Sequence, residues 1–142
     1  MAKSIQTSII IQASPEKIWT ILTDFERYPQ WNPFIISISG EAVQDTSLMV
    51  QIQPPQSKSM AFRPVITSVK RLQELSWIGK LLFKGLFDGA HHFKLQDNGD
   101  GTTTFFHSED FSGILSNIIP LEQTESGFRL LNQKLKEIAE RL

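Results

Sequence analysis

LFDGAHHFKLQDNGDGTTTFFHSEDFSG, residues 86–113, is the stretch that decides the fold of this chain. It consists of two segments of alternating apolar and polar residues that flank a Gly/Asn/Asp cluster at 97–101. Residues of these types accept the positive φ angles that tight reversals need. The stretch therefore predicts a β-hairpin.

The position of the turn sets which residues of the hairpin face each other. A turn centred near Gly99 pairs residues whose numbers add up to about 198. This arrangement predicts His91 opposite His107 and Phe93 opposite Phe105, because antiparallel partners lie directly across the ladder.

One face of this predicted hairpin is mostly apolar, which marks it as the buried face, since side chains alternate between the two faces of a strand. Its residues are His91, Phe93, Leu95, Phe105, His107, Glu109 and Phe111. Two imidazoles and a carboxyl group on a buried face each need a hydrogen-bond partner or water. The pattern favours a cavity with a polar patch.

Length and composition set limits on the protein class. The chain has 142 residues, 40% of them hydrophobic, which predicts one domain over 1–142. It has 14 basic and 15 acidic residues and no basic run, so we expect no nucleic-acid partner. The absence of cysteine excludes disulfides and thiol catalysis. The first residues lack the apolar block of a signal peptide and no apolar run is long enough to span a bilayer, so we expect a cytoplasmic protein without stable membrane insertion.

The rest of the chain alternates with a strand period and then changes to a helix period. Further strands are predicted at 5–13, 34–40, 47–53, 59–70 and 72–79. Pro64 cannot donate to a ladder and predicts a bulge or an edge position. Ser14 and Pro15 suit the start of a helix, and two short helices are expected before Pro33. A long helix is predicted from Leu121, with one stripe at 121, 124, 128, 131, 135, 138 and 142 facing the core.

This order predicts an α+β protein. Seven antiparallel strands should wrap around the C-terminal helix, with the two short helices after the first strand. A twisted sheet need not close completely against one helix, and the remaining gap is the natural place for a ligand.

Several motifs resemble the START-like (SRPBCC) superfamily with the helix-grip fold, which includes polyketide cyclase/dehydrase-like proteins and plant pathogenesis allergen-like proteins. They are the opening segment 13–19, Trp31-Asn32-Pro33, and the segments 75–79, 85–95 and 109–113. The resemblance covers nearly the whole chain. It implies a deep apolar cavity between the sheet and the C-terminal helix for lipids, polyketides or other hydrophobic small molecules. We expect no cofactor.

Inward alternation on the strands and the helix stripe nominate the residues that would contact such a ligand. They are Trp31, Val50, Ile52, Phe62, Trp77, His91, Phe93, His107, Glu109, Phe111, Phe128, Leu131 and Leu135. Trp31 can equally be a packing anchor, since aromatic side chains often only fill cores.

The polar residues His91, His107 and Glu109 allow more than one interpretation. They could form a general acid/base set, because imidazole titrates near neutrality. They could fix the head group of a ligand or hold water. A two-His-one-carboxylate metal site has the least support, because His92 points to the other face, and we expect no metal.

An apolar connection follows the strand at 72–79. Leu81, Leu82, Phe83 and Leu86 lie in it, although connections are usually polar. It could be a lid over the cavity mouth, a homodimer contact or a surface that touches membrane or an acyl chain, or it could pack back on the core.

Together these features predict binding of a hydrophobic small molecule such as a lipid, a polyketide or an aromatic compound. Two alternatives stay open. One is a polyketide cyclase/dehydratase-type enzyme that uses the cavity His and Glu side chains as acid and base, and the other is a lipid or quinone chaperone.

Overall fold

The computed structural model describes residues 3–80, 88–113 and 121–141. The elements follow in the order β1 (Lys3–Ile11), α1 (Pro15–Thr23), the short 3-10 helix η1 (Phe25–Arg27), α2 (Tyr28–Trp31), β2 (Ile35–Ser39), β3 (Met49–Ile52), β4 (Met60–Phe62), β5 (Val65–Lys70), β6 (Glu74–Lys80), β7 (Asp88–Asp97), β8 (Thr103–Ser112) and α3 (Leu121–Ala139). The predicted α+β class, the antiparallel sheet and the long C-terminal helix are confirmed.

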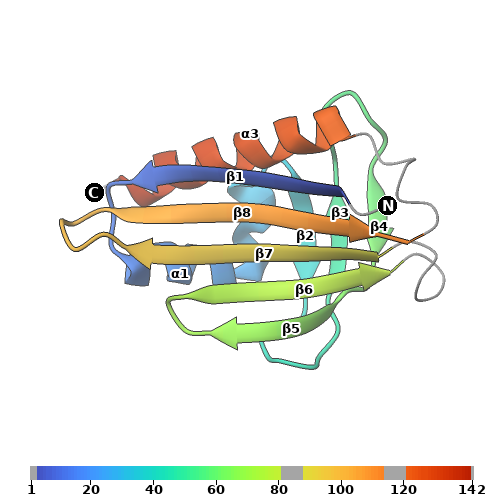
Figure 1. Ribbon diagram of the computed structural model, residues 1–142, viewed down its shortest axis with the longest axis horizontal. Coiled ribbons are helices and arrows are strands. Elements are labelled where there is room, and N and C mark those ends of the chain that lie inside the picture. Colours follow the sequence, from blue (N-terminus) through green and yellow to red (C-terminus); the bar gives the residue numbers. More distant parts are fainter. Residues whose placement is uncertain (1–2, 81–87, 114–120, 142) are drawn as a thin grey trace.

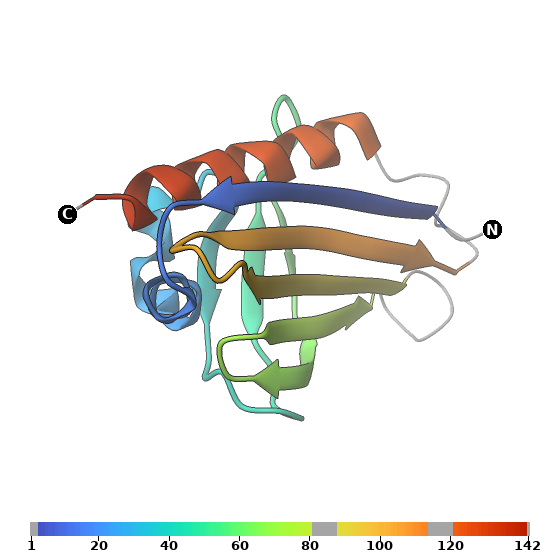
Figure 2. The same ribbon diagram turned by 60° about the vertical axis from the view of Figure 1, so that its left-hand side comes forward.

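Two antiparallel sheets enclose the core. The larger has the order β1-β8-β7-β6-β5 and the smaller has the order β2-β3-β4. In Figure 1 the strands of the smaller sheet cross behind the larger one at a steep angle, and Figure 2 shows α3 lying along the β1 edge. Helix α3 therefore covers the inner face of the larger sheet on the side of β1 and β8.

Local capping explains the short helices that separate β1 from β2. The Ser14 hydroxyl accepts a hydrogen bond from the Lys17 backbone N–H, and Pro15 occupies the first helical position of α1. After α2, the side-chain oxygen of Asn32 accepts from the backbone N–H groups of Phe34 and Ile35. The Asn32 side chain thus holds the turn that leads into β2.

Within the described residues there are eight strands instead of the predicted seven. The difference lies in the segment 59–70, which we expected as one strand. Pro64 has no N–H to donate, and the chain divides here into β4 and β5 in different sheets. The Pro64 carbonyl accepts a hydrogen bond from the Leu48 N–H at 2.9 Å. The residue at the break therefore still forms a backbone hydrogen bond with the segment that precedes β3.

The predicted register of the β7–β8 hairpin is wrong by two residues. His91 pairs with Glu109 and Phe93 pairs with His107. The reversal is centred on Asp100 instead of Gly99, because the Asp100 carboxylate accepts from the Thr102 N–H at 3.0 Å and holds the second half of the turn. A shift of two residues leaves every side chain on its predicted face.

The buried face of α3 differs in part from the predicted stripe. Its buried residues are Thr124, Gly127, Phe128, Leu131, Asn132, Leu135 and Ala139. The stripe drifts along the helix, because 3.6 residues per turn do not match a strict seven-residue repeat. Ile138 is only half-buried, and Leu142 lies outside the described residues.

The predicted lid residues Leu81, Leu82, Phe83 and Leu86 also lie outside the described residues. Among the helices that the structure describes, none has the length and apolar character needed to cross a membrane.

Candidate functional site

Two neighbouring rows of inward-facing side chains on the large sheet carry the polar residues of the site. The first row, across β6, β7, β8 and β1, is Trp77, His91, Glu109 and Ile5. The second row is Leu75, Phe93, His107 and Thr7. His91 and His107 are therefore diagonal neighbours on adjacent strands, a position from which long side chains still meet.

A chain of hydrogen bonds joins five side chains of these rows and of α3. The Thr7 hydroxyl donates to the backbone carbonyl of His107 at 2.7 Å and accepts from the Asn132 side-chain N–H at 2.8 Å. The Asn132 oxygen lies 2.9 Å from His107 Nδ1. His107 Nε2 lies 2.9 Å from His91 Nε2, and His91 Nδ1 lies 3.2 Å from Glu109 Oε1. The polar patch is thus one continuous chain of hydrogen bonds, which we call the wire. It runs from Thr7 on β1 through Asn132 on α3, His107 on β8 and His91 on β7 to Glu109 on β8.

Aromatic rings enclose this wire. Phe128 of α3 stacks on His107 with ring centroids 3.8 Å apart and an interplanar angle of 5°. Trp77 stacks on His91 with centroids 4.9 Å apart, and Phe93 packs edge-on against His91. Both imidazoles are therefore separated from water by rings, and only the carboxyl end of the wire is partly exposed.

Burial favours the protonated form of Glu109 at the carboxyl end of the wire. The Glu109 side chain is 16% exposed. Burial raises the pKa of Glu109 from 4.5 to about 8, while His92 lowers this pKa and Asp110 raises it. The Glu109 carboxyl group is therefore protonated at neutral pH.

The same cause keeps both imidazoles neutral. Burial, and then His92, lowers the pKa of His91 from 6.5 to about 3. Burial, and then His91, lowers the pKa of His107 well below 6.5, although hydrogen bonds with Asn132 and with the Phe128 backbone act in the opposite direction. The wire as a whole is uncharged near pH 7.

Two glycines give the Glu109 carboxyl group its place. A Cβ on Gly89 would fall on Glu109 Oε2 and would lie 3.7 Å from the Phe111 ring. A Cβ on the paired Gly79 would lie 3.5 Å from the Phe62 ring. The carboxyl group therefore lies over Gly89, beside the aromatic ring that covers Gly79.

The structure brings many of the predicted contact residues into this region. Trp77, His91, Phe93, His107, Glu109 and Phe128 contact one another around the wire. Val50, Phe111, Leu131 and Leu135 belong to the same hydrophobic core, and Ile52 and Phe62 pack against it half-buried.

Sequence reasoning missed Thr7 and Asn132 as members of the site. Thr7 stood on the inward face of the predicted first strand, among isoleucines. Asn132 lies four residues after Phe128 and three before Leu135, a spacing that places it on the buried face of α3. In both cases the sequence signal for a site residue was a polar side chain at a position that the strand or helix periodicity places on the buried face.

The third histidine belongs to the opposite face of the sheet. His92 Nδ1 lies 2.9 Å from the Ser76 hydroxyl and His92 Nε2 lies 3.6 Å from Asp110. Ser76 also donates to Glu74 at 2.7 Å. Among the residues that the structure describes, no group of three or more His, Cys, Asp or Glu could hold a metal ion.

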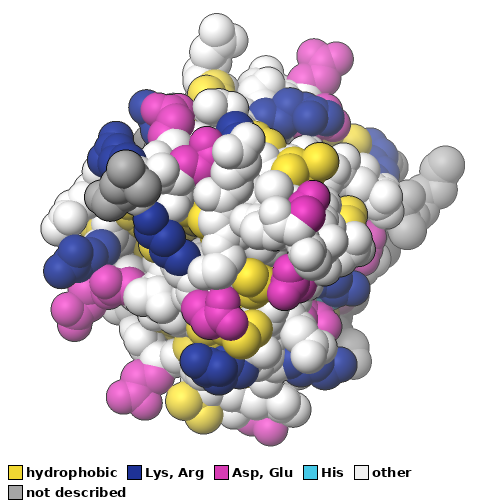
Figure 3. Space-filling model, turned by 90° about the vertical axis from the view of Figure 1, so that its left-hand side faces the viewer, with side chains coloured by type: hydrophobic (Ala, Val, Ile, Leu, Met, Phe, Trp, Pro, Cys, Tyr) yellow, Lys and Arg dark blue, Asp and Glu magenta, His cyan; other side chains and the backbone are white. Residues whose placement is uncertain are grey.

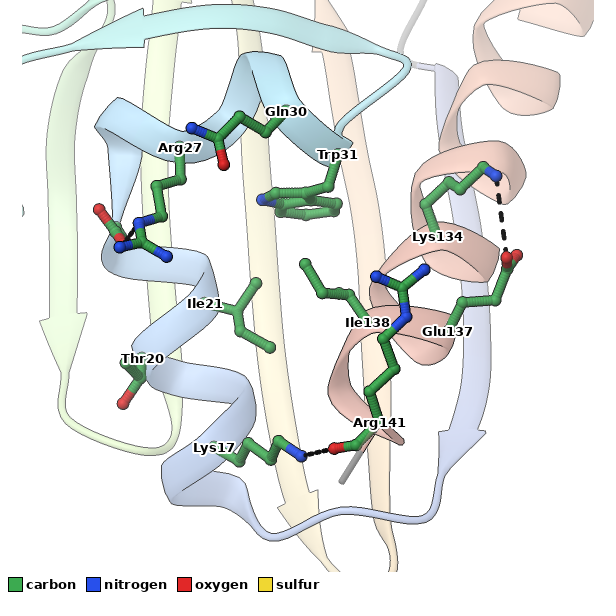
Figure 4. A pocket seen from close by; sticks show the side chains of 11 residues that line it. Lys17, Thr20, Ile21, Arg27, Gln30, Trp31, Lys134, Glu137, Ile138 and Arg141 are labelled. Atoms are coloured by element: carbon green, nitrogen blue, oxygen red, sulfur yellow. Dashed lines mark hydrogen bonds and ion pairs between the residues drawn. The ribbon is translucent and has the colours of Figure 1, made fainter.

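A groove of about 670 Å³ lies elsewhere, between α1, α2 and the last turns of α3. Figure 4 shows Trp31 of α2, Ile21 of α1 and Ile138 of α3 grouped together, and these three side chains are apolar parts of its lining. The Trp31 Nε1–H is buried and has no hydrogen-bond partner among the described residues. Trp31 is thus the predicted contact residue that lines this groove, away from the wire.

Charges of both signs surround the groove. Arg27 pairs with Asp24 at 3.3 Å, Lys134 pairs with Glu137 at 3.7 Å, and the Lys17 ammonium donates to the Arg141 carbonyl. The face in Figure 3 likewise mixes basic and acidic side chains. This end of the molecule therefore presents no field of a single sign to a charged partner.

The fold is shared with many solved structures. A START superfamily protein from Mycobacterium smegmatis is 21% identical, with a TM-score of 0.75 over 96% of this chain and 97% of its own. Major latex-like protein 151 from Panax ginseng is 8% identical, with a TM-score of 0.79 over 99% of both chains. The di-domain ARO/CYC StfQ from the steffimycin biosynthetic pathway is 12% identical, with a TM-score of 0.73 over 99% of this chain and 52% of its own.

Family membership follows from the sequence itself. No curated protein is significantly similar to the chain. The family model described as polyketide cyclase / dehydrase and lipid transport matches residues 2–137. Both activities in that description concern hydrophobic small molecules, which supports hydrophobic ligand binding at a general level. Because the match covers nearly the whole sequence, the chain belongs to this family.

Proposed function

We propose that this protein binds a hydrophobic small molecule between the large sheet and α3, with the polar end of the ligand at the Glu109 carboxyl group. The observation that carries the proposal is the buried wire that ends at Glu109. A core that needed only apolar packing gains nothing from two histidines and a carboxyl group, each of which loses hydration on burial. Ligand recognition gives these groups a use.

The surroundings of Glu109 suit an apolar ligand with one polar group. The half-buried Phe62 ring covers Gly79, and the Phe111 ring lies close to the paired Gly89, over which the carboxyl group lies. Binding sites of this kind combine mostly apolar walls with a few polar groups that set orientation. Lipids, polyketides and aromatic compounds all have this character, and a lipid or quinone chaperone would bind in the same way without any reaction.

The experiment is native mass spectrometry of protein purified from its own host, followed by extraction and identification of the bound molecule. We expect a hydrophobic molecule on the wild type, lower occupancy on Glu109→Leu and unchanged occupancy on Gln133→Ala, an exposed position of α3. A wild type that carries no small molecule, or equal occupancy in Glu109→Leu, would contradict the proposal.

A second candidate is an enzyme of the cyclase/dehydratase type. The observation in its favour is that Glu109, with its pKa raised to about 8, holds a proton that a general acid could give to a bound substrate. Glu109→Gln separates the two functions, because an amide keeps the hydrogen bonds but transfers no proton. An enzyme would lose turnover while it retained binding, whereas a binding protein would show no turnover to lose.

A further inference from the structure

The hydrogen-bond wire has a direction that its anchor at Thr7 determines. The backbone carbonyl of His107 can only accept, so the Thr7 hydroxyl must use its single hydrogen there. Thr7 then accepts from Asn132, which turns the side-chain N–H of Asn132 toward Thr7 and its oxygen toward His107. His107 Nδ1 must therefore carry a hydrogen.

The same reasoning extends to the far end of the wire. A neutral His107 with hydrogen on Nδ1 presents a lone pair at Nε2, so His91 Nε2 must donate across the 2.9 Å between them. A neutral His91 then has a lone pair at Nδ1, and the Glu109 Oε1 hydroxyl must donate to it. Every proton of the wire is assigned, and each points along the wire from Glu109 toward Thr7 and the His107 carbonyl.

This direction resists ionisation of Glu109. If Glu109 lost its proton, a neutral His91 would move its hydrogen to Nδ1 to meet the carboxylate. His91 Nε2 and His107 Nε2 would then face each other with two lone pairs at 2.9 Å, because Asn132 holds the His107 hydrogen on Nδ1. The alternative, a proton shared as Glu109 carboxylate and His91 imidazolium, keeps the same direction but places an ion pair in a buried site, which is costly.

The other oxygen of Glu109, Oε2, takes no part in the wire and is therefore the one left for a ligand. With Oε1–H donated to His91, Oε2 is a carbonyl oxygen over Gly89, and it can only accept a hydrogen bond. An anion at this point would be repelled by the lone pairs of Oε2. An ether or a ketone has no hydrogen to donate to Oε2, and Oε2 has none to give in return. A hydroxyl group supplies the donor without carrying charge into the apolar surroundings.

We infer that the site takes an uncharged apolar molecule with a hydroxyl group, which donates to Glu109 Oε2, and that Thr7 and Asn132 are positioning residues that set this preference. The inference rests on the proposed function for the presence of a ligand at Glu109. The groups that face Glu109 are His91 on β7, with His92 and Asp110 nearby on the outer face.

The first test needs no ligand. In protein labelled with ¹⁵N-histidine, the imidazole nitrogen shifts report which nitrogen carries hydrogen. We expect hydrogen on Nδ1 of His107 and on Nε2 of His91 at pH 7. Hydrogen on Nε2 of His107 would overturn the assigned direction.

Substitutions test the role of the positioning residues. In Asn132→Leu, His107 can change tautomer, so the Glu109 carboxyl, followed by its ¹³C shift, should ionise at lower pH than in the wild type. If Asn132→Leu does not fold, Thr7→Val tests the same anchor with a side chain of the same shape. An unchanged Glu109 titration in the folded variant would remove Asn132 and Thr7 from the mechanism.

The ligand class is tested by titration of the wild type with 2-naphthol, 2-methoxynaphthalene and 2-naphthoate. We expect 2-naphthol to bind at least tenfold more tightly than the other two, and Glu109→Gln to keep this preference, because its amide also donates to His91 and accepts from the ligand. Equal or tighter binding of naphthoate or the methyl ether would overturn the inference and leave the proposed function standing. Binding of none of the three would overturn the proposed function, while the imidazole shifts still decide the direction of the wire.

Discussion

At the scale of single residues, Glu109 connects the buried wire to the ligand. Its Oε1 belongs to the wire and its Oε2 lies over Gly89. Its protonated form resembles a glutamine, because each has a donor group on one side and a carbonyl oxygen on the other, although the glutamine NH2 carries a second hydrogen. This resemblance makes the protonation state testable through stability.

We predict that Glu109→Gln leaves the free energy of unfolding at pH 4, where Glu109 is mostly protonated in the unfolded chain as well as in the folded one, within about 0.5 kcal/mol of the wild type, as for a substitution that breaks no contact. Glu109→Leu should cost about 1–3 kcal/mol, because it leaves the buried Nδ1 acceptor of His91 without a donor. Urea unfolding of the three proteins measures both values. A glutamine as costly as leucine would show that Glu109 is ionised in the folded protein.

At the scale of elements, α3 contains a glycine that helix propensity disfavours. Gly127 lies in the middle of the helix, and a Cβ there would fall on the ring of Phe34. Phe34 also packs against Phe128 with ring centroids 5.3 Å apart. Gly127 thus lets α3 approach the start of β2 closely enough to hold Phe128 over the wire.

Gly127→Ala should therefore destabilise the protein by about 1–3 kcal/mol through overpacking, although alanine favours a helix by about 1 kcal/mol over glycine. Gln133→Ala, at an exposed position of the same helix, should change stability by less than about 0.5 kcal/mol. Thermal and urea unfolding of both variants check the prediction, and a more stable Gly127→Ala would contradict the close packing on Phe34.

The β7–β8 turn depends on backbone conformation. Gly101 has φ +90°, and no atom would meet a Cβ within 4 Å. Gly101→Ala should cost about 1–2 kcal/mol through backbone strain alone, whereas Lys94→Ala on the exposed face of β7 should be nearly neutral. Urea unfolding distinguishes them. Equal stability of the two variants would show that the turn does not need a left-handed residue at 101.

At the scale of the whole molecule, the wire gives stability a pH optimum. Glu109 has its pKa raised from 4.5 to about 8 in the folded state, so its contribution is complete below pH 4.5 and is lost as pH rises toward 8. His91 has its pKa lowered from 6.5 to about 3, so its contribution is complete above pH 6.5 and is lost as pH falls toward 3. The pKa of His107 is lowered as well, which adds to the loss on the acid side.

We therefore expect the contribution of Glu109, His91 and His107 to the free energy of unfolding to be largest near pH 6.5. Between pH 6.5 and 8 the wild type should lose stability relative to Glu109→Gln by up to about 1.4 kcal/mol per pH unit, the value for one proton. Unfolding free energies of both proteins across this range provide the measurement, with the exposed Glu122→Gln as control. A difference that does not change with pH would show that Glu109 gains no proton on folding.

Sequence reasoning reached the fold and much of the candidate site. The alternation at 86–113 placed His91, His107 and Glu109 on the inner face, and this holds in the structure, because alternation has period two and depends only on the local chain. The same local signals predicted the long C-terminal helix and the awkward position of Pro64.

Other features were decided by tertiary structure. The turn is centred on Asp100 instead of Gly99, which shifts the register by two residues. A shift of two residues does not change which side chains face inward, so the alternation of apolar residues cannot reveal it. Asn132 reaches Thr7 across 125 positions of the chain. The direction of the wire follows from donors and acceptors on β1, β7, β8 and α3 together. Such a direction is set by contacts in space, so it exists only once folding has brought these elements into one core.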